Sequence, residues 1–227
     1  MKLLGIETSG EAVSIAVWRD GVVDLRRVGG GATPSETLIP DIMALLRAHA
    51  LTLAGLDAIA LGVGPGMFTG LRVGCSVAQG LALAAERPII PLCSLAVIAA
   101  GQRAERVLVA TDARMGEVYV AAYQRRGALP VAVVPPTCTP PDKVVIPPGE
   151  WFGAGNAFAA DATRPVADAA RLTGCDPDAR AEAGALVALA AAQGLDAAID
   201  PAQVAPLYVR DKVAQTVAER LAQGGKA

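Results

Sequence analysis

The sequence predicts an α/β protein made of two similar lobes, each built around a mixed sheet. Over the first hundred residues, short apolar runs typical of buried strands alternate with helical stretches in the order βββαβαβα. A similar order begins again near Arg106, where an apolar run leads into a polar turn and an alternating strand. Two weakly similar halves of the βββαβα type are typical of the actin-like ATPase fold, also called the ASKHA or ribonuclease H-like fold. The predicted lobes cover residues 1–103 and 104–227.

The bulk properties of the chain restrict its function. Its 227 residues carry a net charge of −2, which argues against strong nucleic-acid binding by the chain alone. The four cysteines are scattered and are expected to be thiols in a reducing cytosol. With His49 as its single histidine, the chain contains no site with two histidine ligands, and a Ser-His-Asp triad is not expected. No signal peptide is visible, so a cytoplasmic protein outside the membrane is expected.

The elements of the first lobe follow from apolar patterns and their boundaries. The hairpin signal Asp20-Gly21 joins the second and third strands. The sequence Thr33-Pro34-Ser35-Glu36 is typical of a helix start, and the helix that begins there has an apolar face at Leu38, Ile42, Leu45 and Leu46. The predicted strands are 2–7, 12–18, 22–28, 56–63 and 88–92, and the remaining helices are 69–85 and 94–101.

The second half is less regular. Strands are predicted over 106–111, 117–124 and 131–134, and a fourth begins at Trp151 and ends in a glycine turn. The proline-rich segment 137–148 predicts connecting structure with at most a short helix. Alanine-rich helices are expected at about 165–172 and 181–192, with a loop over 201–206 and a partly ordered tail from Leu207 after them.

The stretch from Leu61 to Glu86 is the most distinctive part of the sequence. Gly64-Pro65-Gly66 predicts a strand-to-helix turn, and Thr69 is a plausible N-cap for the helix after it. Arg72 is the one formal charge between Thr69 and Ala85, so this helix is expected to be covered by its own lobe or by another protein. The small residues that recur every four positions predict a stripe that another helix could approach closely; they are Gly70, Gly74 and Ala78.

Three polar groups are candidate sites, each with a plainer structural alternative. Glu7-Thr8-Ser9-Gly10 could bind oxygen anions, but an ordinary polar turn at a strand end is favoured. The Gly64–Gly66 turn precedes a helix N-terminus, where anions bind readily, yet no lysine comes after it as a Walker motif requires. Asp112, Arg114 and Glu117 could supply a general base and an anion contact, although an Asp turn with a local ion pair is the favoured interpretation.

Four motifs occur in order along the chain: GIETS at 5–9, GVGPGMFTGLRVG at 62–74, DARMGEVY at 112–119 and PLYVRDKVA at 206–214. Together they resemble the TsaB (YeaZ) family, whose members are bacterial subunits of the machinery that makes N6-threonylcarbamoyladenosine in tRNA. The resemblance implies an actin-like fold with a degraded active site. Ser94 and Ile98 stand where the catalytic paralogue TsaD has two metal-binding histidines. Pro34 and Glu7 depart from the family pattern, which has histidine and aspartate there in many relatives.

The resemblance also implies partners. It predicts a non-catalytic subunit that dimerises with TsaD, works with the ATPase TsaE, and meets tRNA only through that complex, which modifies position 37 of tRNAs reading ANN codons. ATP and metal are expected on the partner subunits, with no cofactor in this chain, and a homodimer is expected when TsaD is absent. The implied interface residues are Leu38, Ile42, Leu45, Gly70, Val73, Gly74, Val77, Ala78 and Leu81. The implied vestigial nucleotide loops comprise Glu7, Thr8, Ser9, Gly64, Gly66 and Thr69.

Two alternatives remain. The chain could be a stand-alone actin-like ATPase or an M22-type peptidase, in which Asp112 or Glu7 would position a metal ion or a water molecule. Direct tRNA binding is disfavoured by the net charge of −2.

Overall fold

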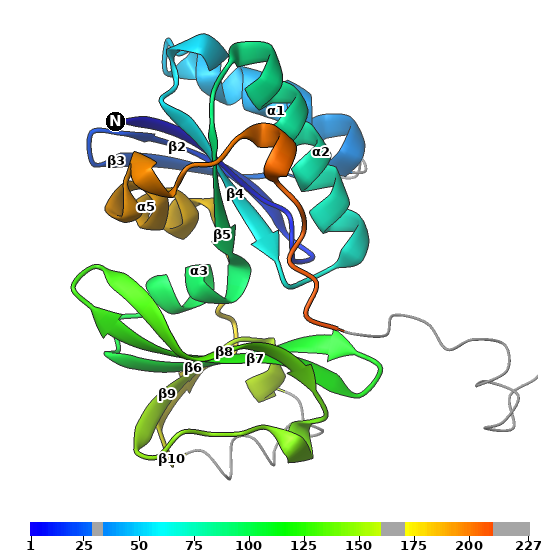
Figure 1. Ribbon diagram of the computed structural model, residues 1–227, viewed down its shortest axis with the longest axis vertical. Coiled ribbons are helices and arrows are strands. Elements are labelled where there is room, and N and C mark those ends of the chain that lie inside the picture. Colours follow the sequence, from blue (N-terminus) through cyan, green and yellow to red (C-terminus); the bar gives the residue numbers. More distant parts are fainter. Residues whose placement is uncertain (29–33, 160–170, 211–227) are drawn as a thin grey trace, which may run out of the picture.

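The computed structural model describes residues 1–28, 34–159 and 171–210, which form two lobes with a five-stranded sheet in each (Figure 1). In the first lobe the sheet order is β3-β2-β1-β4-β5; β1, β2 and β3 are antiparallel neighbours, whereas β4 and β5 run parallel to β1. Its elements are β1 (Lys2–Glu7), β2 (Val13–Arg19), β3 (Val22–Val28), α1 (Pro34–Ala48), β4 (Ala58–Gly64), α2 (Phe68–Ala85), β5 (Ile89–Cys93) and α3 (Ser94–Ala100). This order matches the one expected from the sequence.

The second sheet repeats the topology of the first. Its order is β10-β9-β6-β7-β8, with β6, β7 and β8 antiparallel and with β9 and β10 parallel to β6. The strands are β6 (Arg106–Arg114), β7 (Glu117–Arg126), β8 (Leu129–Thr139), β9 (Glu150–Ala154) and β10 (Arg171–Asp176). Replacing β1 to β5 by β6 to β10 in turn converts one sheet order into the other, so the predicted restart near Arg106 is confirmed. The two-lobed α/β fold is the actin-like one.

Helices cover both faces of the first sheet. On one face, α1 and α2 pack on β1 and β2 through an apolar cluster that includes Leu4, Ile6 and Ile15. On the other face, α5 (Ala183–Gln193) contacts Leu3 and Ala16, the residues of the same strands that point the opposite way. The chain therefore returns to the first lobe after β10. The predicted second lobe of residues 104–227 is corrected accordingly, because α5 belongs to the first.

Several boundaries differ from the expected ones. Strand β8 continues through Pro135 and Pro136 to Thr139, which an edge strand tolerates because one side of its backbone is unpaired. Most of the helix expected at 165–172 lies outside the described residues, but its last two residues begin β10. The expected cap at Thr33 also lies outside them, as do residues 211–227 of the tail. The short helix expected within the proline-rich segment is the single turn Pro141–Lys143.

Helix α2 begins at Phe68 rather than after a Thr69 cap. The N-cap residue is Met67, and no side chain caps the helix there. By length and composition the helix could cross a membrane, with 18 residues and a mean hydropathy of 1.2. Instead it packs on β4 and buries Leu71, Cys75 and Ala82 within its own lobe.

Candidate functional site

A cleft of about 640 Å³ lies between the two lobes. The first lobe contributes the turn between β1 and β2, the start of α2 and one side of α3, while the second contributes the β6–β7 hairpin and Asn156. The segments 177–181 and 207–210 complete the lining. Cavities of 300–1,000 Å³ are the usual size for small-molecule sites, so the lining residues decide what this cleft can do.

Glu7 lies beneath the floor of the cleft and does not reach it. Its side chain is fully buried, and Oε1 accepts a hydrogen bond of 2.7 Å from the Ser9 backbone N–H. Oε2 accepts one of 3.0 Å from Ser94 Oγ, which in turn accepts one of 3.2 Å from the Gly64 N–H. Burial raises the pKa of the Glu7 carboxyl, although its hydrogen bonds with Ser9 and Ser94 oppose this rise. The carboxyl therefore joins β1, β4 and α3 inside the lobe.

The turn after Glu7 packs its backbone directly on α2. The Ser9 carbonyl accepts a 2.7 Å hydrogen bond from Met67 N, the N-cap amide of that helix. A Cβ at Gly66 would lie 2.3 Å from the Ser9 oxygen, and one at Gly70 would lie 2.1 Å from the Thr8 oxygen. A Cβ at Gly74 would lie 2.2 Å from Thr8 Oγ1. The glycines thus let the turn approach the helix, and the Ser9 carbonyl occupies the N–H of the N-cap residue Met67.

The six predicted nucleotide-loop residues therefore separate into three groups. Ser9 and Gly66 line the cleft. Glu7, Thr8 and Gly64 are buried beside it, and Thr69 is exposed on α2 outside the lining. The favoured interpretation of Glu7-Thr8-Ser9-Gly10, a polar turn at a strand end, agrees with these contacts.

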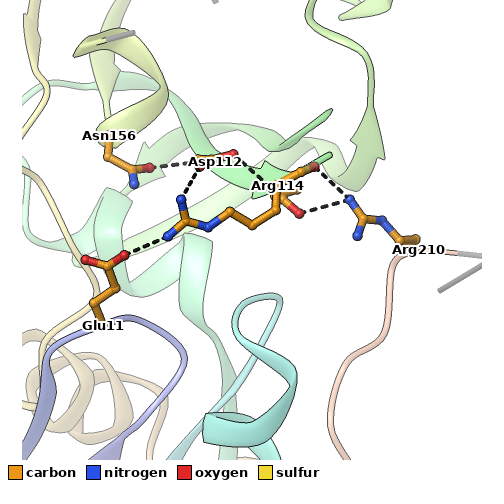
Figure 2. A network of polar contacts seen from close by, with 6 residues as sticks. Glu11, Asp112, Arg114, Asn156 and Arg210 are labelled. Carbon is orange, nitrogen blue, oxygen red and sulfur yellow. Dashed lines mark hydrogen bonds and ion pairs between the residues drawn. The ribbon is translucent and has the colours of Figure 1, made fainter. Parts of the chain in front are cut away.

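The polar constellation of the second lobe forms a network at the mouth of the cleft (Figure 2). Asp112 accepts a 2.7 Å hydrogen bond from the Arg114 N–H, and its own N–H donates to Asn156 Oδ1 at 2.9 Å. The Arg114 guanidinium pairs with Asp112 at 3.2 Å and crosses to Glu11 of the first lobe at 2.7 Å. This is the Asp turn with a local ion pair that the sequence favoured. The sequence did not indicate Glu11 as its partner, because 103 residues separate the two.

Arg210 is a second cation in this network, and the sequence analysis did not single it out. It donates to the Ala113 and Arg114 carbonyl oxygens at 2.9 and 3.2 Å. It also pairs with Glu117 Oε2 at 2.7 Å, and its side chain is only 16% exposed. The third member of the predicted constellation, Glu117, is therefore engaged by a residue from the end of the described chain.

Comparisons with known proteins agree with this fold. A family model described as TsaD, tRNA N6-adenosine threonylcarbamoyltransferase, matches residues 32–217. The tRNA threonylcarbamoyladenosine biosynthesis proteins TsaB of Escherichia coli and Haemophilus influenzae are 43% and 40% identical to the chain over 129 residues. Each match covers 55% of this chain, and 56% and 55% of the respective relatives. The chain thus spans little more than half the length of these curated relatives.

Two solved structures match over almost their whole length. A crystal structure described as an uncharacterized protein with similarity to peptidase YeaZ from Pseudomonas aeruginosa is 34% identical, with a TM-score of 0.83 over 92% of this chain and 99% of that one. YeaZ from Pseudomonas aeruginosa is 32% identical, with a TM-score of 0.81 over 91% and 99%. The chain belongs to the TsaB (YeaZ) family.

The burial of the interface residues expected for a TsaB family member corrects part of that set. The side chains of Leu38, Ile42, Leu45 and Ala78 are fully buried in the core of the first lobe, and Gly74 is buried against Thr8. These five residues have no surface to offer, and Gly70 lies against the Thr8 carbonyl. Thr8 of the same chain covers Gly70 and Gly74, and the apolar core of the first lobe covers Ala78.

The rest of the predicted interface remains accessible. Val73, Val77 and Leu81 are half-buried at the edge of the first-lobe core. Beside them, a second stripe of small residues at four-residue spacing faces solvent along α2: Ser76, Gly80 and Ala84. A Cβ at Gly80 would meet no atom of the described residues within 4 Å. The sequence shows both stripes, and the structure decides which one is accessible.

The other ligand-type side chains of this TsaB family member are dispersed. His49 Nε2 lies 2.8 Å from Asp24 Oδ2 at the end of α1, away from the cleft. No group of three or more histidine, cysteine, aspartate and glutamate side chains that could hold a metal ion occurs within residues 1–28, 34–159 and 171–210. All four cysteines are free thiols.

Proposed function

We propose that the chain is a non-catalytic subunit that binds a TsaD-type partner in the formation of N6-threonylcarbamoyladenosine at position 37 of tRNAs reading ANN codons. Family membership supports the pathway, since relatives with 43% and 40% identity are named for this biosynthesis. The observation that carries the subunit role is the solvent-facing side of α2, which is long, almost uncharged and accessible in the described part of the chain. TsaE is the further partner that this proposal includes.

The exposed side of α2 is suited to close helix packing. Ser76, Gly80 and Ala84 lie one turn apart, so a partner helix could approach the backbone without displacing large side chains. Val73, Val77 and Leu81 border this stripe and would supply the apolar area. We call these six residues the α2 docking face.

Helix α1 extends the same surface. It lies on the same face of the sheet as α2, and Figure 1 shows the two helices next to each other. Ile39 is 46% exposed and Met43 is half-buried, so α1 also presents apolar atoms. An interface of ordinary size removes about 800 Å² from each partner. A two-helix surface on a TsaD-type chain, or on a second copy of this chain when TsaD is absent, would bury an area of that order.

The contacts of the polar residues support a role without catalysis by this chain. Glu7, a fully buried carboxylate beside the cleft, already accepts hydrogen bonds from Ser9 and Ser94. Arg114 and Arg210, two cations that could hold an anion, are paired with Glu11 and Glu117. ATP and metal are accordingly assigned to the partner subunits, and contact with tRNA to the complex as a whole.

The substitution Gly80→Arg tests the docking face. Arginine forms helices better than glycine and no described atom lies within 4 Å of the new Cβ, so the monomer should remain folded. A long charged side chain in the middle of a closely packed helix pair should weaken association with TsaD by at least about 100-fold, or about 2.7 kcal/mol. Titration calorimetry with purified TsaD measures this loss, and tRNA modification in a strain that carries the variant gives the functional readout.

Val145→Arg is the matched control. Val145 is 75% exposed in the second lobe, so the control adds the same charge away from both helices. It should leave the affinity for TsaD unchanged. Wild-type affinity and modification in Gly80→Arg would refute the docking face, and failure of the wild-type chain to bind TsaD would refute the subunit role.

A stand-alone ATPase or peptidase is the second candidate, and the cleft of about 640 Å³ is the observation in its favour. In that case the isolated chain should bind ATP with Mg²⁺ at submicromolar Kd and turn it over, or should cleave peptide substrates. Calorimetry and a phosphate-release assay on the purified chain decide between the candidates. We expect neither tight binding nor turnover, because the paired Arg114 and Arg210 would first have to lose their carboxylate partners.

A further inference from the structure

The last described segment of the chain, Leu207 to Arg210, connects the two lobes across the cleft; we call it the strap. It comes after the short helix Pro201–Gln203 and runs to the β6–β7 hairpin, as the orange-to-red trace of Figure 1 shows. Two other described segments join the lobes, residues 101–105 after α3 and residues 177–182 before α5. The strap is thus a further connection, and its contacts differ from those of the other two.

The strap is fixed to the first lobe at several points. The Leu207 N–H donates to the carbonyl of Val63, near the C-terminal end of β4, at 2.7 Å. Upstream, Gln79 of α2 donates to the carbonyl oxygens of Pro201 and Val204 at 3.0 and 3.1 Å. Tyr208 packs on Phe68, with 5.7 Å between the ring centroids, and its hydroxyl accepts a hydrogen bond from Arg72 Nε. These contacts make the strap a firm extension of the first lobe.

Arg210 then attaches the strap to the second lobe. It donates to the carbonyl oxygens of Ala113 and Arg114, which lie in the turn region of the β6–β7 hairpin, and it pairs with Glu117. Arg114 returns the connection to the first lobe through its ion pair with Glu11 at 2.7 Å (Figure 2). Polar contacts therefore form a closed ring around the mouth of the cleft: first lobe, strap, hairpin and first lobe again.

The opposite side of the cleft is apolar and continuous. Leu95 and Ile98 of α3 line the cleft and also pack against Val107 and Tyr123 of the second sheet. This interface contains one long hydrogen bond, 3.5 Å between Cys93 Sγ and the Tyr123 hydroxyl, whereas the ring at the mouth consists of shorter contacts made by charged side chains. A full pivot about α3 would therefore require both bridges to open, the contacts of Arg210 with the hairpin and the pair of Arg114 with Glu11.

We propose that the strap is a conformational clamp, which holds the two lobes closed over the cleft through Arg210 and the Glu11–Arg114 pair. Two-lobed proteins with a cleft usually close around a bound ligand, which bridges the lobes. Here the chain's own cations and carboxylates supply the bridge. This inference concerns the isolated chain and does not depend on the proposed subunit role.

The test is amide hydrogen exchange on the purified full-length chain with the substitution Arg210→Met. Methionine keeps an unbranched apolar side chain and removes every donor. Exchange should accelerate by about tenfold or more on both sides of the cleft, in the hairpin peptide 111–119 and in the first-lobe peptide 64–71, because charge-assisted hydrogen bonds are lost. Rates for the buried strands β1 and β4 serve as the internal reference, and the ratio of cleft to core rates is the quantity compared.

Two further variants keep the result decisive. Arg126→Met removes an exposed arginine at the far end of β7 and should leave all ratios unchanged. Glu11→Gln breaks the exposed ion pair from the first-lobe side and should raise exchange in the hairpin by about two- to fivefold. The clamp is refuted if Arg210→Met accelerates exchange in the hairpin alone, which would mean local fraying, or if neither side of the cleft changes relative to the core.

Discussion

In the first lobe, Thr8 and Ser9 at the start of the turn after β1 are buried against α2, where Gly70 faces the Thr8 carbonyl oxygen and Gly74 faces the Thr8 hydroxyl. In the second lobe, the turn after β6 occupies the same place in the topology but remains exposed, and Asn156 contacts it through a side chain. The start of the first turn, Thr8 and Ser9, has become part of a core, whereas its exposed Glu11 pairs with Arg114 of the second turn. The equivalent turns of two halves with the same strand order therefore differ in burial: the first packs mainly by its backbone, and the second makes mainly side-chain polar contacts.

The difference arises from the helix that comes after the fourth strand of each lobe. In the first lobe Gly64 leads into the 18-residue helix α2, whose small residues admit the turn backbone. In the second lobe Gly155, with a φ of +118°, leads into the short helix Asn156–Ala159. The turn of the second lobe is therefore held by a side chain, since Asn156 Oδ1 accepts the hydrogen bond from the Asp112 N–H. Packing on α2 leaves no room for a ligand between that helix and Thr8, whereas the contact with the Asn156 side-chain amide leaves the rest of the second turn in solvent.

The largest expected effect comes from a methyl group placed between the first turn and α2. In Gly70→Ala the new Cβ would lie 2.1 Å from the Thr8 carbonyl oxygen, and backbone must move to accommodate it. We expect the free energy of unfolding to fall by about 2 kcal/mol, because overpacking outweighs the gain in helix propensity. Urea denaturation monitored by circular dichroism measures the change.

Gly80→Ala in the same helix is the matched control, since its Cβ would meet no described atom within 4 Å. It should stabilise the chain by about 0.5–1 kcal/mol. Equal effects at Gly70 and Gly80 would show that the turn does not depend on the glycine stripe.

The buried Glu7 gives the second prediction, which concerns pH. Because its folded-state pKa is raised above the ordinary 4.5, ionisation opposes folding. The contribution of Glu7 to the free energy of unfolding is fully present below its unfolded-state pKa. It is lost as the pH rises through the folded-state pKa. Glu7→Gln should therefore match the wild type near pH 4 and exceed it in stability at pH 8, by about 1.4 kcal/mol for each unit by which the pKa is raised.

Thermal unfolding between pH 4 and 8 checks the prediction for Glu7→Gln. Asp112→Asn in the second lobe is the comparison, because that carboxylate lies in a partly exposed turn. Its stability difference from wild type should stay within about 0.5 kcal/mol over the same pH range. A wild type that is more stable than Glu7→Gln at pH 8 would contradict the raised pKa.

The smallest expected effect comes from comparing a contact made by a side chain with a contact made by the backbone. Asn156→Ala removes the acceptor for the Asp112 N–H and should cost about 1 kcal/mol. Met67→Ala, at the equivalent contact of the first lobe, should cost less than about 0.5 kcal/mol, because Met67 uses its backbone N–H and its side chain is 48% exposed. Chemical denaturation of the two variants compares them, and equal losses would remove the distinction between the turns.

The sequence predicted the architecture well because the strands of both sheets carry strong local signals. The buried run at β4, the Asp20-Gly21 hairpin and the restart at Arg106 are each recognisable within ten residues. Strand β10 was missed because Arg171–Asp176 contains glycine and polar residues, and its strand character depends on pairing with β9. Strand β8 was shortened at Pro135 because its position at the sheet edge is not visible in the sequence.

The site was harder to predict, because its contacts join residues far apart in the chain. The sequence predicted one stripe of small residues on α2, and the structure shows that Thr8 covers Gly70 and Gly74 of that stripe, whereas Gly80 on a second stripe stays open. The partner of Arg114 lies 103 residues away, and that of Arg210 lies 93 positions upstream at Glu117. The family resemblance predicts an interface on two helices, and burial then shows which residues on those helices are accessible.

The return of α5 to the first sheet has a consequence for synthesis. Leu3 and Ala16 stay uncovered until Ala183–Gln193 has left the ribosome, so the N-terminal lobe, although made first, cannot complete its core until more than four-fifths of the 227-residue chain has been translated. The second sheet is complete at Asp176, before that point. The half that begins the chain is therefore the last to finish folding, and a ribosome that stalls between the two elements would expose an unprotected apolar sheet to chaperones.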